Sequence, residues 1–294
     1  MSWKSWGATM MVCGIFLCSA GASGQYETSS AAAAAKKPFR WPEGKRAALS
    51  VSFDDARLSQ IDRGLALLEK CGLKVTFFVS PDSVEKRLEG WKKAMAAGHE
   101  IANHSLTHPC TGNYAFSLHN ALEDYTLQEM AQNIDGGSAA IERLLGVKPV
   151  TFAYPCGQKF VGRGREVKSY VPLVAERFIV GRGYLDEAAN DPAFCDLAQA
   201  TGMGIDDMDS QQVLKLLTQA SQEGRWLITV GHEIGERGYQ VTDAAAIEAL
   251  AKYALDPAHG IWVDTVENIG KYIRQQRAAG QWRYTSPQVS PPCE

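Results

Sequence analysis

The segment Ala47-Ala-Leu-Ser-Val-Ser-Phe-Asp-Asp55 joins a continuous apolar run to two adjacent carboxylates. A short apolar run of this kind predicts a strand that is buried on both faces. The next such run, Lys74–Val79, follows a stretch with helical spacing of its apolar residues, Leu58–Lys70. A buried strand, an amphipathic helix and a second strand are typical of a parallel sheet with helices outside it.

The same alternation of strands and helices continues along the chain. The predicted strands are 47–53, 74–79, 100–103, 150–154, 177–182, 225–230 and 261–263. The predicted helices are 58–70, 82–97, 127–145, 167–176, 211–222, 243–254 and 266–277. No linker divides this region, so the pattern predicts one barrel-like α/β domain at 45–285.

The composition excludes two classes of protein. Hydrophobic residues make up 45% of the 294 residues, which excludes a disordered chain. The chain has 30 Lys and Arg against 33 Asp and Glu, a net charge of -3. Nucleic-acid binders normally carry a basic excess, so we expect no nucleic-acid partner.

The N-terminus has the features of a secretory signal peptide. One basic residue precedes a short apolar run, Trp6–Cys18, and the small residues Ala20-Gly-Ala22 follow it. The run is too short for a transmembrane helix, although a retained membrane anchor is the alternative. We predict a signal peptide at 1–22, a secreted or periplasmic protein, and no stable membrane span after its removal. The flanking predictions are a linker at 23–44 and a C-terminal tail at 286–294.

Five cysteines remain after residue 22, which is an odd number. Export would permit disulfides, but the spacing matches no zinc finger and does not say which cysteines pair. They are Cys71, Cys110, Cys156, Cys195 and Cys293.

Polar clusters follow three of the predicted strands. Asp54 and Asp55 follow the first strand, His104 and His108 the third, and His232 the sixth. Chemistry in barrels of this kind lies at the C-terminal ends of the strands. Two histidines at i,i+4 face one side if the segment forms a helical turn, and a carboxylate would complete an open three-ligand metal site. Surface or capping roles are the alternative for each motif taken alone.

Adjacent carboxylates can divide the work of a hydrolase. One coordinates the metal, and the other accepts a proton from water that the metal acidifies. His232 is then the imidazole that can act as general acid. These residues alone suggest metal-assisted hydrolysis of an acyl or amide bond.

Four motifs in order resemble the polysaccharide deacetylases, carbohydrate esterase family four. Ser52-Phe-Asp-Asp-Ala56 looks like the family's T-F-D-D-G motif, and His104-Ser-Leu-Thr-His108 is similar to H-[ST]-x-x-H. Phe152-Ala-Tyr-Pro-Cys-Gly157 stands where the family has its third motif, and resembles a branch with F-A-Y-P-x-G. Leu227-Ile-Thr-Val-Gly-His232 resembles the last motif. The resemblance implies a distorted (β/α)7-type barrel with a single catalytic domain.

The resemblance also implies a role for each matching residue. Asp54 would be the catalytic base and His232 the catalytic acid. The backbone N–H of Cys156 would help to bind the oxyanion. The ligands of a divalent metal, usually Zn²⁺ with Co²⁺ or Ni²⁺ as alternatives, would be Asp55, His104 and His108.

Two departures from the family pattern need a substitute. The Arg that orients the catalytic Asp in the family is Ala153 here, and we predict that Arg182 pairs with Asp54 instead of facing substrate or solvent. In the family an Asp orients the histidine that acts as catalytic acid, and the sequence does not identify this Asp. Asp206, Asp207 and Asp209 are the candidates.

The prediction is a secreted metal-dependent hydrolase that removes acetyl groups from a glycan or oligosaccharide. An N-acetyl amide and an O-acetyl ester are both open, and Tyr154 and Phe160 are candidate sugar contacts. The alternatives are an amidohydrolase acting on a non-sugar amide, and a non-catalytic glycan-binding protein on an esterase scaffold.

Overall fold

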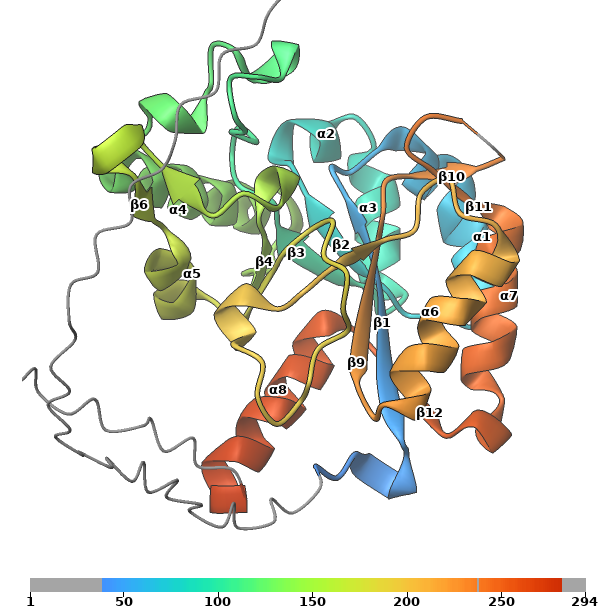
Figure 1. The fold of residues 1–294 in the computed structure, drawn as a ribbon. Coiled ribbons are helices and arrows are strands. Elements are labelled where there is room, and N and C mark those ends of the chain that lie inside the picture. Colours follow the sequence, from blue (N-terminus) through green and yellow to red (C-terminus); the bar gives the residue numbers. More distant parts are fainter. Residues whose placement is uncertain (1–38, 237, 282–294) are drawn as a thin grey trace, which may run out of the picture. The chain divides into compact units, whose positions relative to one another are not determined.

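A computed structural model of the chain describes residues 39–236 and 238–281 (Figure 1). The predicted signal peptide at 1–22, most of the predicted linker, and the predicted tail at 286–294 lie outside these residues. The described residues form one domain built around a curled parallel sheet with helices outside it.

The sheet has eight strands, and all of their pairings are parallel. Their order is β7-β4-β3-β2-β1-β9-β8, with β12 beside the first half of β1. The strands are β1 (Ala47–Asp54), β2 (Thr76–Val79), β3 (Glu100–Asn103), β4 (Thr151–Ala153), β7 (Val180–Arg182), β8 (Met203–Gly204), β9 (Trp226–Gly231) and β12 (Ile261–Val263). The curled sheet is a half-barrel, which confirms the predicted distorted (β/α)-type barrel in one domain.

Helices cover both faces of this sheet, and α6 and α7 lie side by side on one of them (Figure 1). The helices are α1 (Leu65–Lys70), α2 (Pro81–Glu85), α3 (Leu88–Ala96), α4 (Leu127–Leu145), α5 (Val171–Arg177), α6 (Ser210–Gln222), α7 (Ala244–Leu255) and α8 (Val266–Gln276). No helix among the described residues has both the length and the apolar character needed to cross a membrane.

Strand β1 runs through the centre of the sheet, and all eight of its residues are buried. One edge pairs with β12 and then β2, and the other edge pairs with β9. A strand covered on both faces favours apolar residues along its length. The first carboxylate therefore stands at its last position, Asp54, on the edge where (β/α) folds place their chemistry.

The shortest strands and one helix break were missed by the sequence analysis. Segments of two or three residues are too short for a periodic pattern. The predicted helix at 82–97 is two helices, α2 and α3, because Arg87 (φ -142°, ψ 39°) leaves the helical region between them. The missed strands are β8, β5 (Phe160–Val161), β6 (Lys168–Ser169), β10 (Glu233–Gly235) and β11 (Val241–Asp243).

The folded domain begins before the predicted boundary at residue 45. Trp41 is only 5% exposed and lies in a core cluster with residues of α8. Its indole N–H donates to the carbonyl of Gly224 (3.0 Å), and its ring stacks on Tyr272. The linker prediction was wrong for residues 41–44, because one buried tryptophan before the first strand leaves no periodic signal.

Candidate active site

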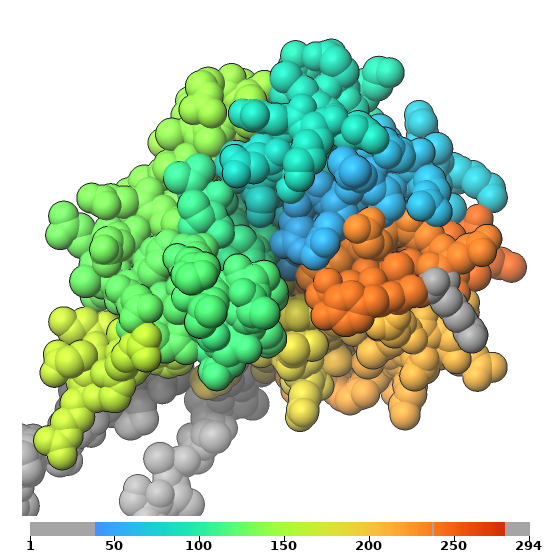
Figure 2. Space-filling view, turned by 90° about the horizontal axis from the view of Figure 1, so that it is seen from above, coloured from blue at the N-terminus to red at the C-terminus, as the bar shows by residue number. Residues whose placement is uncertain are grey.

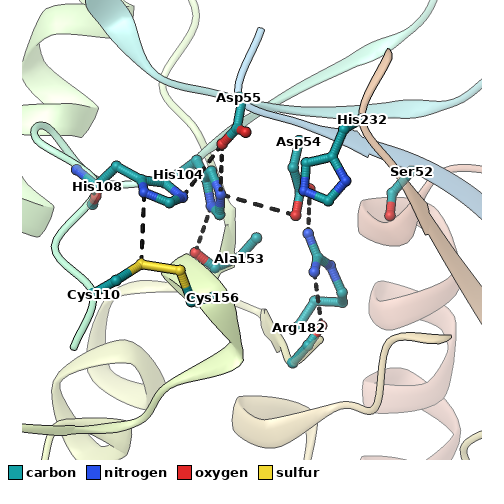
Figure 3. A network of polar contacts seen from close by, with 12 residues as sticks. Ser52, Asp54, Asp55, His104, His108, Cys110, Ala153, Cys156, Arg182 and His232 are labelled. Carbon is teal, nitrogen blue, oxygen red and sulfur yellow. Dashed lines mark hydrogen bonds and ion pairs between the residues drawn. A yellow bond between two sulfur atoms is a disulfide. The ribbon is translucent and has the colours of Figure 1, made fainter. Parts of the chain in front are cut away.

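Five side chains from three strand ends meet at the C-terminal edge of the sheet (Figure 3). Asp54 ends β1 and Asp55 follows it, while His104 and His108 follow β3 and His232 follows β9. These are the residues that the sequence analysis selected because each follows a predicted strand. The structure brings them to one mouth.

Asp55 lies between the two histidines. Its Oδ1 is 3.3 Å from Nε2 of His104 and 3.3 Å from Nε2 of His108. Ligand atoms that share one ion at about 2.0–2.2 Å stand roughly 3–3.5 Å apart, so these three atoms fit one divalent cation. The other oxygen of Asp55 accepts from Arg57 (2.9 and 3.1 Å), which leaves Oδ1 for the cation.

The protonation states of Asp55 and His108 suit a metal site. Burial raises the pKa of Asp55, but the hydrogen bond to His104 and the charges of the histidines hold that pKa well below its ordinary value. Burial lowers the pKa of His108 to about 4, and the neighbouring His104 adds to this effect. Asp55 is therefore ionised and His108 neutral at pH 7, the forms that bind metal.

The loop that carries the histidines is a bend, and the helical turn assumed from the sequence is wrong. Ser105 and His108 have positive φ angles of 66° and 52°. The side-chain oxygen of Asn103 accepts from the N–H of Ser105 (2.5 Å), and Asn133 of α4 accepts from the N–H of Leu106 (3.0 Å). These side-chain bonds replace the helical backbone ladder, and they still bring both imidazoles to one point.

His104 is fixed in the orientation that a ligand needs. Its Nδ1 lies 3.0 Å from the carbonyl of Ala153, to which it donates. The lone pair of Nε2 then faces Asp55. A second hydrogen bond of this kind is the usual way in which a metal-binding histidine is held in one tautomer.

Arg182 forms a buried ion pair with Oδ1 of Asp54, as the sequence analysis predicted. The guanidinium also donates to the carbonyl of Gly183 (2.7 Å) and stacks over the ring of Phe78. Arg182 of β7 pairs in register with Ala153 of β4. The cation that the motif lacks on β4 is therefore supplied from the same level of the neighbouring strand. Arg182 is fully buried, so it does not face substrate.

Asp206 is the carboxylate that contacts His232. Its Oδ2 lies 2.5 Å from Nδ1 of His232, and its Oδ1 accepts from Thr242 (2.7 Å). Burial lowers the pKa of His232, but the bond to Asp206 and the charges of Asp54 and Asp55 outweigh burial, so the pKa is raised. Nε2 of His232 makes no hydrogen bond with the residues that the structure describes. Of the other candidates, Asp209 caps the start of α6.

Gln60 connects the two sides of the mouth and was missed by the sequence analysis. Its side-chain amide donates to the carbonyls of Asp54 (2.7 Å) and His232 (2.8 Å). It begins a π-helical turn, Gln60–Gly64, a form that often marks functional sites. An amide bound to two backbone carbonyls leaves no pattern that a sequence could reveal.

A disulfide joins the histidine loop to the third motif. Cys110 bonds to Cys156, and Sγ of Cys110 lies 3.7 Å from Nδ1 of His108. Cys156 has a positive φ of 53° in a tight turn, which Gly157 closes by donating to the carbonyl of Tyr154 (2.8 Å). The sequence left this pairing open. The only available signal was that both cysteines follow strands, β3 and β4, that prove to be neighbours.

Tyr154 does not contact substrate, and that prediction was wrong. Its side chain is fully buried, and its hydroxyl donates to the carbonyl of Ala198 (2.6 Å). An aromatic residue one position past a strand can turn inward as readily as outward. Phe160, the other candidate sugar contact, is exposed.

Residues 36–169 match the family model described as polysaccharide deacetylase. Over this region the chain is similar to the polysaccharide deacetylase family. The matched region includes Asp54, Asp55, His104, His108 and the third motif, while Arg182, Asp206 and His232 lie beyond it. The geometry described above therefore supplies the second half of the site independently of that match.

Three relatives show how far the likeness extends. A candidate polysaccharide deacetylase from Mycobacterium smegmatis has a TM-score of 0.60 at 18% identity, over 86% of this chain and 98% of its own. A mutant of BA3943, a CE4 family pseudoenzyme, has a TM-score of 0.50 at 18% identity, over 80% of this chain and 71% of its own. Both share the fold, and the second shows that this fold alone does not establish catalysis.

The third relative is a gellan lyase from Bacillus sp, which is 26% identical over 222 residues. The match covers 76% of this chain but only 7% of the lyase. What the whole of that large protein does is therefore not transferable to this chain.

Proposed function

We propose that this chain is a divalent-metal-dependent hydrolase that removes acetyl groups from a carbohydrate. The observation that carries the proposal is the convergence of three metal-compatible atoms with a separately oriented carboxylate and imidazole at one mouth. A site that only binds a glycan does not need metal ligands, a base and an acid on separate residues. The match of residues 36–169 to the polysaccharide deacetylase model supports the acetylated glycan as substrate class.

Asp55, His104 and His108 would hold the ion, for which Zn²⁺ suits the donor set and Co²⁺ or Ni²⁺ are alternatives. When bound, the ion would supply Lewis acidity to the acetyl carbonyl and to water. The remaining steps belong to residues of the chain itself.

Asp54 acts as the general base. Arg182 holds one carboxylate oxygen, and the other lies 3.9 Å from Nε2 of His104, toward the trio. That second oxygen accepts the proton of the attacking water. His232, oriented by Asp206, donates its Nε2 proton to the departing amine or alcohol. The backbone N–H of Cys156 stabilises the charge that develops on the acetyl oxygen.

The test is acetate release from a panel of acetylated glycans that includes N-acetyl and O-acetyl compounds. We expect release to stop with a chelator, to return with Zn²⁺ or Co²⁺, and to be lost in His104→Ala together with bound metal. Full activity of His104→Ala would overturn the metal assignment. Glycan binding without acetate release by the metal-loaded protein would favour a non-catalytic scaffold, and release from non-sugar amides alone would favour an amidohydrolase.

Export to the periplasm or medium is part of the proposal, because acetylated structural glycans lie outside the cytoplasm. The predicted signal peptide supports it. Cleavage after Ala22 would be read by N-terminal sequencing of the mature protein, and recovery of the uncleaved chain from the cytoplasm would contradict export.

A further inference from the structure

Two aromatic rings lead outward from the candidate metal ligand His108. The centroid of the Phe116 ring lies 6.2 Å from that of His108. The Tyr114 ring follows, with its centroid 5.3 Å from that of Phe116 and the two planes within 8° of parallel. Nearly parallel rings at this separation are offset, so their faces form one extended apolar surface. Tyr114 and Phe116 are called the aromatic platform below.

The platform is exposed to solvent. Phe116 is 69% exposed and Tyr114 43% exposed, and Leu118 beside them is also exposed. Seen from above the strand ends, the green segment that contains them stands beside the blue end of β1 and the orange segment after β9 (Figure 2). Clustered apolar side chains on a surface usually mark a binding site, and this cluster is continuous with the candidate active site.

The loop beneath the platform is firmly anchored. The hydroxyl of Ser117 donates to the carbonyl of Cys110 (2.9 Å) and accepts from its N–H (2.9 Å). The carboxylate of Glu123 accepts from the N–H of Gly112 (3.0 Å), and the disulfide fixes Cys110 itself. The rings are therefore presented on a built support, which reduces the entropy lost when a ligand binds.

The platform carries no formal charge. Residues 109–122 contain no Asp, Glu, Lys or Arg. An anionic ligand generally needs cations, and this loop supplies none. Arg163, next to the Gly162 that donates to the carbonyl of Leu122, is paired with Asp124. A neutral sugar ring fits better, because its faces present C–H groups to the electron-rich faces of the aromatic rings and its hydroxyls point outward to water.

We propose that Tyr114 and Phe116 form a subsite that binds uncharged sugar rings next to the acetyl group that reacts. The position of the reacting group rests on the proposed function, whereas binding of the neutral glycan does not. The subsite makes the protein select oligosaccharides over small acetyl esters.

The first test compares a chitin pentamer with 4-nitrophenyl acetate as substrates. For Tyr114→Ala and Phe116→Ala we expect the ratio of kcat/KM for the pentamer to kcat/KM for the ester to fall about two- to tenfold per ring. Phe116→Trp keeps a ring face and is expected to retain the ratio. Phe116→Leu keeps apolar volume without a ring face and is expected to lower it. An unchanged ratio in both alanine variants would overturn the subsite.

The matched control is Phe194→Ala, since Phe194 is 66% exposed, close to the value for Phe116. Arg277, at the end of α8 that is remote from the mouth, donates to the carbonyls of Pro192 and Cys195 in the loop of Phe194. We expect this variant to leave the ratio unchanged. An equal fall in the control would mean that the ratio reports general surface effects, and would contradict the proposal.

The second test measures binding of the pentamer to Asp54→Asn by calorimetry, with and without each ring. We expect Kd to rise about two- to tenfold per ring, and polygalacturonate, an anionic glycan, to compete poorly. Ring-dependent binding together with no acetate release by the wild-type protein would overturn the proposed function and leave the subsite standing. Normal acetate release by the wild-type protein together with ring-independent binding would overturn the subsite and leave the proposed function standing. If Phe116→Ala instead splits a dimer in sedimentation and leaves glycan binding unaltered, the platform is a contact between copies.

Discussion

Asp54 and His108 face the same mouth, but the molecule holds them in different ways. Asp54 and His232 are both buried. Asp54 is paired with the guanidinium of Arg182, and His232 with the carboxylate of Asp206. These four residues are the charge-paired region. The side chain of His108 is 26% exposed, and its loop is held by amide side chains and a disulfide. Residues 104–122 with Cys156 are the loop region.

This difference separates chemistry from substrate selection. A buried charge is costly unless a partner stays in place, so the charge-paired region tolerates little change. The loop region relies on a covalent bond, backbone contacts and an exposed aromatic platform, which can vary without leaving a charge unpaired. We therefore expect substitutions in the first region to abolish activity or stability, and those in the second, apart from the proposed metal ligands His104 and His108, to adjust them.

The largest effect is expected for Asp54→Asn. An amide cannot accept the proton of water, and a general base contributes about 10²–10⁴-fold to the rate. We expect acetate release to fall by that factor while the metal content stays near that of the wild type, because the ligands are Asp55, His104 and His108. Metal analysis beside the kinetics checks this, and joint loss of metal and activity would show that Asp54 is a ligand.

The second effect is on stability, through Arg182→Met. This change leaves the Asp54 carboxylate buried without its cation, which costs about 3–5 kcal/mol in the free energy of unfolding. Urea unfolding measures this cost. We expect the double variant Arg182→Met/Asp54→Asn to recover much of it, because no unpaired charge remains. Additive losses in that double-mutant cycle would mean that the ion pair contributes nothing.

The sequence was informative wherever a functional side chain follows an apolar run. Asp54, His104 and His232 could be placed in this way, because the ends of parallel strands share one edge of a sheet. Arg182 could be proposed because it ends a predicted strand in a chain whose third motif lacks the family's arginine. Its register opposite Ala153 needed the structure.

Other parts of the site depend on contacts that no local pattern records. Asn133 and Gln60 bind backbone groups far away in the chain, and which groups they meet follows from the packing of whole elements. The disulfide follows from the adjacency of β3 and β4. The bend at 104–108 was mistaken for a helical turn, because i,i+4 spacing does not distinguish a helix from a loop held by side chains.

A third, smaller effect is expected for the loop region when Cys110→Ala and Cys156→Ala are combined. The disulfide closes a sequence separation of 46 residues, and losing it lowers the free energy of unfolding by about 2–4 kcal/mol. We expect metal binding to weaken about tenfold, because Cys110 packs against His108. Unfolding and metal titration check both, with Cys71→Ala as control. A loss of activity as large as that of Asp54→Asn would contradict the distinction between the two regions.

Glu100 offers a third way of holding a buried carboxylate. Glu100 begins β3, at the end of the strand that is opposite to the mouth. Its partners are hydroxyls and a backbone amide, whereas the partner of Asp54 is a guanidinium. Glu100 accepts from Thr76 (2.7 Å), from Thr151, and from the N–H of Glu267 (2.9 Å). Burial raises the pKa of Glu100 to about 7, the three hydrogen bonds oppose the shift, and the charge of Glu267 adds to it.

The smallest effect follows from this raised pKa. The pKa of Glu100 in the unfolded chain is the ordinary 4.5, so the folded chain holds this proton more tightly. The contribution of Glu100 to the free energy of unfolding is therefore greatest in acid and falls as the pH rises toward 7. Between pH 6 and pH 8 we expect a loss of about 1 kcal/mol. Glu100→Gln accepts from Glu267 and donates to Thr151 without titrating, so its stability relative to the wild type should increase over that range. If the difference between the two proteins does not change with pH, hydroxyls and one amide hold a buried carboxylate as well as Arg182 does.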